Sequence, residues 1–133
     1  MRGGSFLDTN ILVYFAVRKS EKYPRAAELL EIGGAISVQV LNEFASVARS
    51  KMKLEWDEIA TTLEFIGSLV DIHPLTVATN KRALALAERY RLHIYDAMIV
   101  AAALEAGCDT LYSEDMQHGQ MIEGRLRIAN PFV

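Results

Sequence analysis

The run from Ala97 to Leu104 constrains the fold more than any other stretch, because no residue in it carries a polar side chain. A helix that is apolar around its whole circumference is normally buried. Alanine dominates the run, which favours a helix and allows close packing. Gly107 follows as a typical helix stop. We therefore predict a central buried helix over residues 94–106.

Asp96 lies in the first turn of this apolar helix. One interpretation is a capping residue, stabilised by free backbone N–H groups and the helix dipole. The other is a carboxylate at the mouth of the core that faces further charged groups, because ionised carboxylates are rarely buried unless they are paired or bound to metal. This segment alone leaves both interpretations open.

The composition predicts a single globular domain over residues 1–133, with 51% hydrophobic residues. The formal net charge of −3 argues against a binder that relies only on a basic surface. The one cysteine, Cys108, excludes an intramolecular disulfide and a cysteine-based zinc site. No apolar signal-peptide core follows Met1–Ser5, and no segment is long enough to span a bilayer. We expect a soluble protein of a reducing compartment, without membrane contact.

Short apolar runs alternate with helical patterns along the chain. We predict strands over residues 5–7, 35–36, 71–73, 110–112 and 126–128, with the last at a sheet edge. Further helices are predicted over residues 11–17, 24–30, 38–51, 54–70 and 76–90. One apolar face of the fourth comprises Trp56, Ile59, Leu63, Ile66 and Val70. The alternation predicts an α/β fold, a three-layer α/β/α sandwich with a short, mostly parallel central sheet.

Acidic residues occur where such a fold gathers its functional groups. Asp8 ends the first predicted strand, Asp115 follows the strand over residues 110–112, and Asp96 begins the central helix. In open α/β sheets, sites form beyond the carboxyl ends of the strands and at the helix N-termini there. Glu43, one turn after Gln39 on its helix, adds a fourth acid. We predict that the four acids share one rim of the sheet.

Carboxylates gathered in this way repel one another, and a divalent cation removes the conflict. Mg²⁺ prefers oxygen ligands, and no His or Cys spacing in the sequence points to zinc. The residues alone leave a second interpretation open, in which two acids end strands by chance and Glu43 is a solvated helix residue.

Four short motifs then resemble those of one family, in the family's order and approximate spacing. Phe6-Leu7-Asp8-Thr9-Asn10-Ile11-Leu12 resembles the opening motif of PIN-domain nucleases. Asn42-Glu43-Phe44, Tyr95-Asp96-Ala97 and Leu111-Tyr112-Ser113-Glu114-Asp115 resemble the other three. The tail, Asp115-Met116-Gln117-His118-Gly119 with Ile128-Ala129-Asn130-Pro131-Phe132, is similar to the VapC branch, the ribonuclease toxins of bacterial toxin–antitoxin pairs. The resemblance spans essentially the whole chain.

This resemblance implies an endoribonuclease that depends on Mg²⁺ or Mn²⁺. Asp8, Glu43, Asp96 and Asp115 match the family's acidic quartet, with Asp8 and Asp96 as direct metal ligands. Glu43 and Asp115 would help through water or a second metal. The polar helpers implied are Thr9, Asn10 and Ser113. The sequence departs from the family's motifs at two positions. His93 stands where small polar residues are usual, and Glu114 lies next to Asp115, which leaves open which of these two acids faces the metal.

The resemblance also implies partners: an RNA substrate, a VapB-type antitoxin, a homodimer and a heterotetramer or larger assembly, all in the bacterial cytoplasm. Candidate phosphate contacts after the Glu43 helix are Arg49, Lys51 and Lys53, and a second basic group is Arg18, Lys19 and Lys22. Tyr14 and Tyr95, near the acidic motifs, are candidates to stack on an unpaired base. Solvated surface charge and core packing are the plainer alternatives for these residues.

Two other functions compete with the nuclease. A non-catalytic PIN-like RNA-binding or interaction domain would be suggested by loss of a key acid, but all four are present. A phospho-acceptor signalling domain needs a pair of acids after the first strand and a lysine after a later one. Asp8 stands alone and no lysine follows Tyr112, which argues against the signalling domain.

Overall fold

The strands of the computed structural model, which describes residues 4–133, form one sheet in the order β3-β2-β1-β4-β6-β5. Most of the opening segment Met1–Ser5 lies outside the described residues. All neighbouring strands are parallel except β5 and β6, which are antiparallel. The bounds are β1 Ser5–Leu7, β2 Ala35–Ser37, β3 Asp71–His73, β4 Thr110–Tyr112, β5 Met121–Ile122 and β6 Leu126–Ala129. The prediction of a short, mostly parallel sheet is confirmed.

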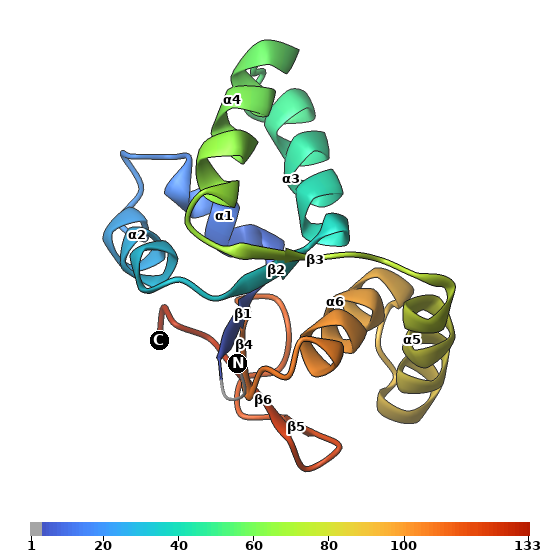
Figure 1. The fold of residues 1–133 in the computed structure, drawn as a ribbon. Helices are drawn as coiled ribbons and strands as arrows, with labels where there is room; N and C mark the ends of the chain where they lie inside the picture. Colours follow the sequence, from blue (N-terminus) through green and yellow to red (C-terminus); the bar gives the residue numbers. More distant parts are fainter. Residues whose placement is uncertain (1–3) are drawn as a thin grey trace.

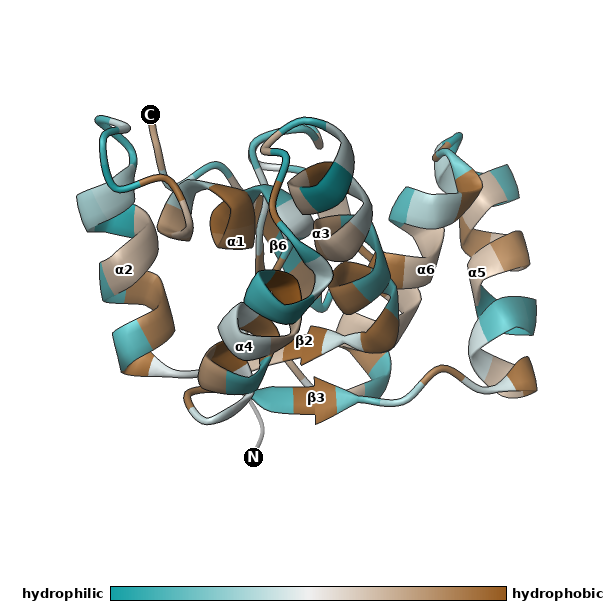
Figure 2. Ribbon diagram, turned by 90° about the horizontal axis from the view of Figure 1, so that it is seen from above, coloured by the Kyte–Doolittle hydropathy of each residue, from teal (hydrophilic) through white to brown (hydrophobic). Residues whose placement is uncertain are grey.

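Helices cover both faces of this sheet. Helices α1 and α2 lie on one side and α5 and α6 on the other, as both views show (Figures 1 and 2). The bounds are α1 Thr9–Phe15, α2 Tyr23–Ile32, α3 Val38–Ser50, α4 Trp56–Gly67, α5 Val77–Tyr90 and α6 Ile94–Glu105. The predicted three-layer α/β/α sandwich is therefore confirmed. No helix within residues 4–133 has both the length and the apolar character needed to cross a membrane.

Three helices begin at side chains that the sequence places directly before helical runs. The side chains of Asp8, Ser37 and Thr76 accept hydrogen bonds from backbone N–H groups in the first turns of α1, α3 and α5. Such a cap satisfies an N–H group that has no partner within the helix. Because β1 and β2 lead straight into capped helices, α1 and α3 both begin at the carboxyl edge of the sheet.

Helix α6 forms the centre of the core, as predicted. Every residue from Ala97 to Leu104 is buried, and α6 packs against α5, β2 and α3. Gly107 follows with a φ of +76°, a backbone conformation that favours glycine. The small alanine side chains allow neighbours to approach on every side, which explains why this helix has no solvent-facing stripe.

One prediction about the periphery is wrong. The strand over residues 126–128 is not at the edge, because β6 lies between β4 and the short β5, which the sequence did not reveal. Trp56 does not join the buried face of α4 but is 62% exposed, whereas Ile59 and Ile66 are buried. Trp56 is the first residue of α4, where the Arg49 guanidinium lies 5.1 Å from the centre of its ring.

Gly34 provides a test of the β1–β2 contact. Its φ is +136°, and a Cβ added there would lie 2.6 Å from the backbone oxygen of Ser5. We expect Gly34→Ala to lower the free energy of unfolding by about 2–4 kcal/mol, because the overlap is with backbone of the paired strand. Urea denaturation measures the loss.

The matched control is Gly124→Ala, where φ is +66° and nothing lies within 4 Å of an added Cβ. This change should cost only about 1 kcal/mol, the price of a left-handed backbone alone. Equal losses in the two variants would contradict the overlap argument.

Candidate active site

The Asp8 carboxylate is buried at the junction of β1 and α1 and makes short hydrogen bonds. Its Oδ1 accepts from the backbone N–H of Thr9 at 2.6 Å, and its Oδ2 accepts from the hydroxyl of Ser113 at 2.7 Å. The Asn10 amide lies 3.5 Å from the same Oδ2. These contacts join the loop that follows β4 to the end of β1, so two strand ends meet at one carboxylate.

Asp115 lies in that loop and is exposed at its surface. Its Oδ2 accepts from the Asn10 amide nitrogen at 3.2 Å, and its backbone N–H donates to the Ser113 hydroxyl oxygen at 3.2 Å. The other end of the Asn10 amide accepts from the backbone N–H of Glu114 at 3.2 Å. Asn10 therefore links both acids of the loop to α1, while Ser113 links the loop to Asp8.

Glu43 reaches the same region from α3. Its Oε1 accepts from the Thr9 hydroxyl at 2.8 Å, and its Oε2 accepts from the Gln39 amide at 2.8 Å. The prediction that Gln39 and Glu43 lie together one turn apart is confirmed. Both oxygens of Glu43 thus have a fixed orientation, set by one residue of its own helix and one of α1.

The charges of neighbouring acids affect the pKa values of Asp8 and Asp96. Burial is the main reason why the pKa of Asp8 is raised to about 6. The hydrogen bonds from Ser113 and Thr9 lower this pKa, whereas the charges of Asp96 and Glu43 raise it. Burial also raises the pKa of Asp96, as do the charges of Glu43 and Asp115, although His93 opposes them. Of the predicted acidic quartet, Asp8, Glu43 and Asp115 are joined through the hydrogen bonds of Thr9 and Asn10. Asp96 is linked to the other acids by these charge effects alone.

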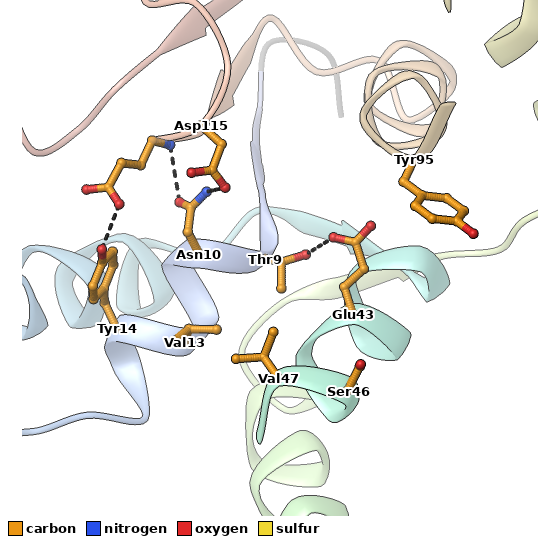
Figure 3. Close-up of a pocket in the computed structure, with 10 residues that line it drawn as sticks. Thr9, Asn10, Val13, Tyr14, Glu43, Ser46, Val47, Tyr95 and Asp115 are labelled. Carbon is orange, nitrogen blue, oxygen red and sulfur yellow. Dashed lines mark hydrogen bonds between the residues drawn. The ribbon is translucent and has the colours of Figure 1, made fainter. Parts of the chain in front are cut away.

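A pocket of about 450 Å³ opens between α1, α3 and the start of α6, and Asp8 and Asp96 are not among the residues that line it (Figure 3). Glu43 and Asp115 line it together with Thr9 and Asn10, and Val13 and Val47 form an apolar part of its wall. Tyr95, which is 57% exposed, borders the pocket from α6. The volume falls in the range of small-molecule and cofactor sites.

Tyr14 and Glu114 form a further side of the pocket. The Tyr14 hydroxyl donates to Glu114 at 2.6 Å, and Lys22 forms an ion pair with the same carboxylate. Burial by itself would raise the pKa of Glu114, but the hydrogen bonds from Lys22 and Tyr14 and the charge of Lys22 lower it. Lys22 and Tyr14 therefore hold the pKa of Glu114 below its usual value, whereas the pKa values of Asp8 and Asp96 are raised.

The oxygen atoms around the pocket are suitable ligands for a hard divalent cation. They are carboxylate, amide and hydroxyl oxygens, the ligands that Mg²⁺ and Mn²⁺ prefer. Within residues 4–133, no three Asp, Glu, His or Cys side chains stand at the spacing of a finished metal site. The oxygens of Asp8 and Glu43 instead accept hydrogen bonds from Ser113, Thr9 and Gln39. The chemistry of the group fits such a cation, whose charge would offset the mutual repulsion of the acids.

The basic residues predicted after the Glu43 helix lie away from this pocket. Lys51 and Lys53 are exposed and do not line the pocket. Arg49 donates to the backbone oxygen of Leu54 at 3.0 Å and lies over the Trp56 ring. His93 caps α6, where its Nδ1 accepts from the backbone N–H of Tyr95 at 3.1 Å. His93 thus has the ordinary role of a residue at the start of a helix.

Sequence reasoning missed several residues around the pocket. Val13 and Val47 follow Thr9 and Glu43 by one helical turn, so helical spacing from the acidic motifs is the signal that indicates them. The contacts of Tyr14 and Lys22 with Glu114 have no such signal, because the partners are 100 and 92 residues apart. The sequence suggests a stacking or core-packing role for Tyr14 and a phosphate contact or a solvated surface charge for Lys22, but not their contacts with Glu114.

A family model described as the PIN domain matches residues 5–121, a range that contains all four acids. The chain therefore belongs to the PIN domain family, and the resemblance drawn from its motifs is confirmed. Among curated protein sequences, none matches the chain significantly.

Solved structures share the fold over most of their length. A toxin–antitoxin complex from Klebsiella pneumoniae matches with a TM-score of 0.72 and 23% identity, covering 96% of this chain and 97% of that one. VapBC2 from Rickettsia felis, bound to a DNA fragment from its promoter, matches at 0.67 and 26%, covering 95% and 97%. VapC20 from Mycobacterium tuberculosis, a Sarcin-Ricin loop cleaving toxin, matches at 0.69 and 16%, covering 84% and 89%. The fold of this chain is thus similar to that of VapC-type toxins.

The raised pKa of Asp8 predicts how stability depends on pH. The pKa of Asp8 is about 6 in the folded protein, against an ordinary value of 3.8, so the protonated Asp8 carboxyl stabilises the fold. This contribution to the free energy of unfolding is lost as pH rises through 6. In the presence of a chelator, Asp8→Asn should therefore gain stability relative to the parent between pH 4 and pH 7. At about 1.4 kcal/mol per pKa unit, the gain is at most about 3 kcal/mol.

Urea denaturation at a series of pH values measures this difference. The same series on Asp71→Asn, an exposed aspartate of β3, should show no such trend relative to the parent. A parallel pH dependence of the parent and Asp8→Asn would contradict the assignment.

Proposed function

We propose that this protein is an endoribonuclease that depends on a divalent cation, Mg²⁺ or Mn²⁺, and acts as the toxin of a toxin–antitoxin pair. The observation that carries the proposal is a group of four acids at one end of the sheet. Glu43 and Asp115 line the pocket. Asp8 and Asp96 lie outside its lining, and burial and the charges of the neighbouring acids raise their pKa values. A protein gains no stability from clustering like charges, so the cluster points to a cation that neutralises them.

In this proposal Asp8 and Asp96 bind the cation directly. They are the two acids whose pKa values are raised by burial and by their acidic neighbours. Glu43 and Asp115 act through water or a second metal. Thr9, Asn10 and Ser113, joined by Gln39, hold these carboxylates in orientation through the hydrogen bonds described above.

A bound cation supplies charge neutralisation at the scissile phosphate and lowers the pKa of a coordinated water. Because phosphoryl transfer depends mainly on positioning and on electrostatic stabilisation, the chain need not provide a separate nucleophile. Its own contributions are the fixed carboxylates and the exposed ring of Tyr95, which offers a stacking surface for an unpaired base. Ser113, committed to Asp8 and to backbone N–H groups, is a positioning residue rather than a nucleophile.

We further propose a VapB-type antitoxin as the protein partner and a homodimer as the toxin unit. The solved complexes from Klebsiella pneumoniae and Rickettsia felis support a paired toxin and antitoxin. Helix α4 exposes Trp56 and Phe65, at 62% and 55%, and Phe65 lines a groove together with Phe15 and Leu54. Exposed apolar groups gathered in this way are typical of a protein-binding surface. Access to cellular RNA is consistent with a bacterial cytoplasmic location.

The second candidate function is a non-catalytic PIN-like module that binds RNA or protein. The hydrogen bonds that engage Asp8 and Glu43 favour it, because the acids are satisfied without a cation. The nuclease is preferred because hydrogen bonding alone gives no reason to keep four acids together. The phospho-acceptor alternative lacks support, because no lysine of residues 4–133 lines the pocket.

RNA cleavage is the direct test. Purified protein, freed of any partner, should cleave structured RNA when Mg²⁺ or Mn²⁺ is present and stop when EDTA is added. Asp96→Asn should reduce the rate by more than the roughly 10- to 100-fold that loss of an outer partner costs, because a direct ligand is lost. Gel analysis of end-labelled RNA measures both effects.

Asp71→Asn is again the matched control and should cleave like the parent. RNA binding without cleavage, unchanged by EDTA, would favour the non-catalytic module. A phosphoaspartate at Asp8 would favour the signalling domain.

The partner surface makes a separate prediction. Co-purification from the native host should yield the chain together with a small second protein, and Phe65→Asp should release it by placing a charge in the apolar contact. Leu84→Asp changes an equally exposed apolar residue, 56% exposed on α5, and should leave the complex intact. Size-exclusion chromatography distinguishes the two, and retention of the partner by Phe65→Asp would exclude the α4 surface.

A further inference from the structure

Glu114 sits next to Asp115, yet its carboxylate is held by a different set of residues. Oε1 accepts from the Tyr14 hydroxyl at 2.6 Å, and Oε2 pairs with the Lys22 ammonium. The Lys22 ammonium also donates to the Tyr14 hydroxyl oxygen at 3.3 Å. The three polar groups thus form a closed triangle on one side of the pocket.

Aromatic rings fix the position of the lysine in this triangle. The ammonium lies 4.8 Å from the centre of the Tyr14 ring and 5.5 Å from that of Phe132, and the two rings meet edge to face at 5.2 Å. A cation between two rings is held by both of them. Lys22, at the start of α2, therefore has a defined position rather than that of a solvated surface lysine.

The backbone of Glu114 is anchored as well as its side chain. Its N–H donates to Asn10 Oδ1 at 3.2 Å, and the Asn10 amide nitrogen donates to Asp115 Oδ2 at 3.2 Å. Asp115 itself is exposed, and no ion pair to it occurs within residues 4–133. Its place at the pocket thus depends on Asn10, on the Ser113 hydroxyl that accepts from its backbone N–H, and on the residue that precedes it.

We infer that Lys22, Tyr14 and Glu114 form a positioning triad that holds the loop after β4 so that Asp115 faces the pocket. The inference rests on the proposed function, because it assigns these residues a task in the same metal-dependent site. Glu114 is then neither a metal ligand nor a general acid, and Lys22 is not a phosphate contact. Groups that orient an acid of a metal site from outside contribute to metal affinity by holding that acid in place.

The variants that test this are Glu114→Gln, Lys22→Met and Tyr14→Phe, the last of which keeps the ring packed on Phe132. We expect each to raise the Mn²⁺ concentration for half-maximal cleavage by roughly 10- to 100-fold. The kcat should fall at limiting Mn²⁺, while KM for RNA should change less than about twofold. The double variant Glu114→Gln/Lys22→Met should be no worse than the worse single variant, because the two residues act as a unit.

Direct Mn²⁺ binding, followed by calorimetry without RNA, separates the triad from the nuclease proposal. If the parent binds Mn²⁺ but does not cleave RNA, and the variants bind more weakly, the positioning role holds and the proposed function fails. If the parent does not bind Mn²⁺, both fail. Lys81→Met, on the exposed side of α5, is the matched control and should behave like the parent.

Three results would overturn the triad alone, provided that thermal unfolding shows the variants to be folded. A loss in Glu114→Gln as large as in Asp96→Asn would make Glu114 a direct ligand. A rise in KM for RNA in Lys22→Met, with unchanged Mn²⁺ binding, would make Lys22 a phosphate contact. Unchanged Mn²⁺ affinity and cleavage in all three variants would leave the triangle a purely structural contact.

Discussion

The buried Asp8 carboxylate is the group on which both the fold and the candidate site depend. Its bond from the Thr9 N–H begins α1, and its bond from the Ser113 hydroxyl ties β1 to a loop 105 residues away. Both bonds are made to a group whose charge is disfavoured by burial and by Asp96 and Glu43. An asparagine or serine at this position would cap the helix without that penalty. A buried carboxylate that costs stability is expected where a residue has a function beyond folding.

Much of the architecture was predictable because local and global signals agree. Ser37 and Thr76 stand directly before helical runs, and each caps the helix that follows. The uninterrupted apolar run over residues 97–104 has no face suited to water, and the structure buries all of it. Where short strands alternate with capped helices, a layered sheet with helices on both faces is the arrangement that buries the apolar side of each element.

The periphery was not predictable, since it depends on contacts between distant residues. Strand β5 has two residues, too few for any periodic pattern, and its presence moves β6 from the edge to an inner position. Trp56 fits the apolar repeat of α4, but it occupies the first position of the helix, and Arg49 covers its ring from α3. Hydrophobic spacing indicates which face of a helix is apolar, whereas its ends are decided by what the rest of the fold places beside them.

The candidate site likewise has one part that was predictable from the sequence and one part that was not. Parallel strands end at one edge of a sheet, so the proximity of Asp8 and Asp115 followed from the predicted order of strands and helices. The motif favours Asp115 over its neighbour Glu114 as the acid of the site, but it does not show what sets the two carboxylates apart. The answer lies 92 residues away, at Lys22, whose ammonium pairs with Glu114. An ion pair that satisfies one of two adjacent carboxylates leaves the remaining negative charge at this end of the pocket to Asp115.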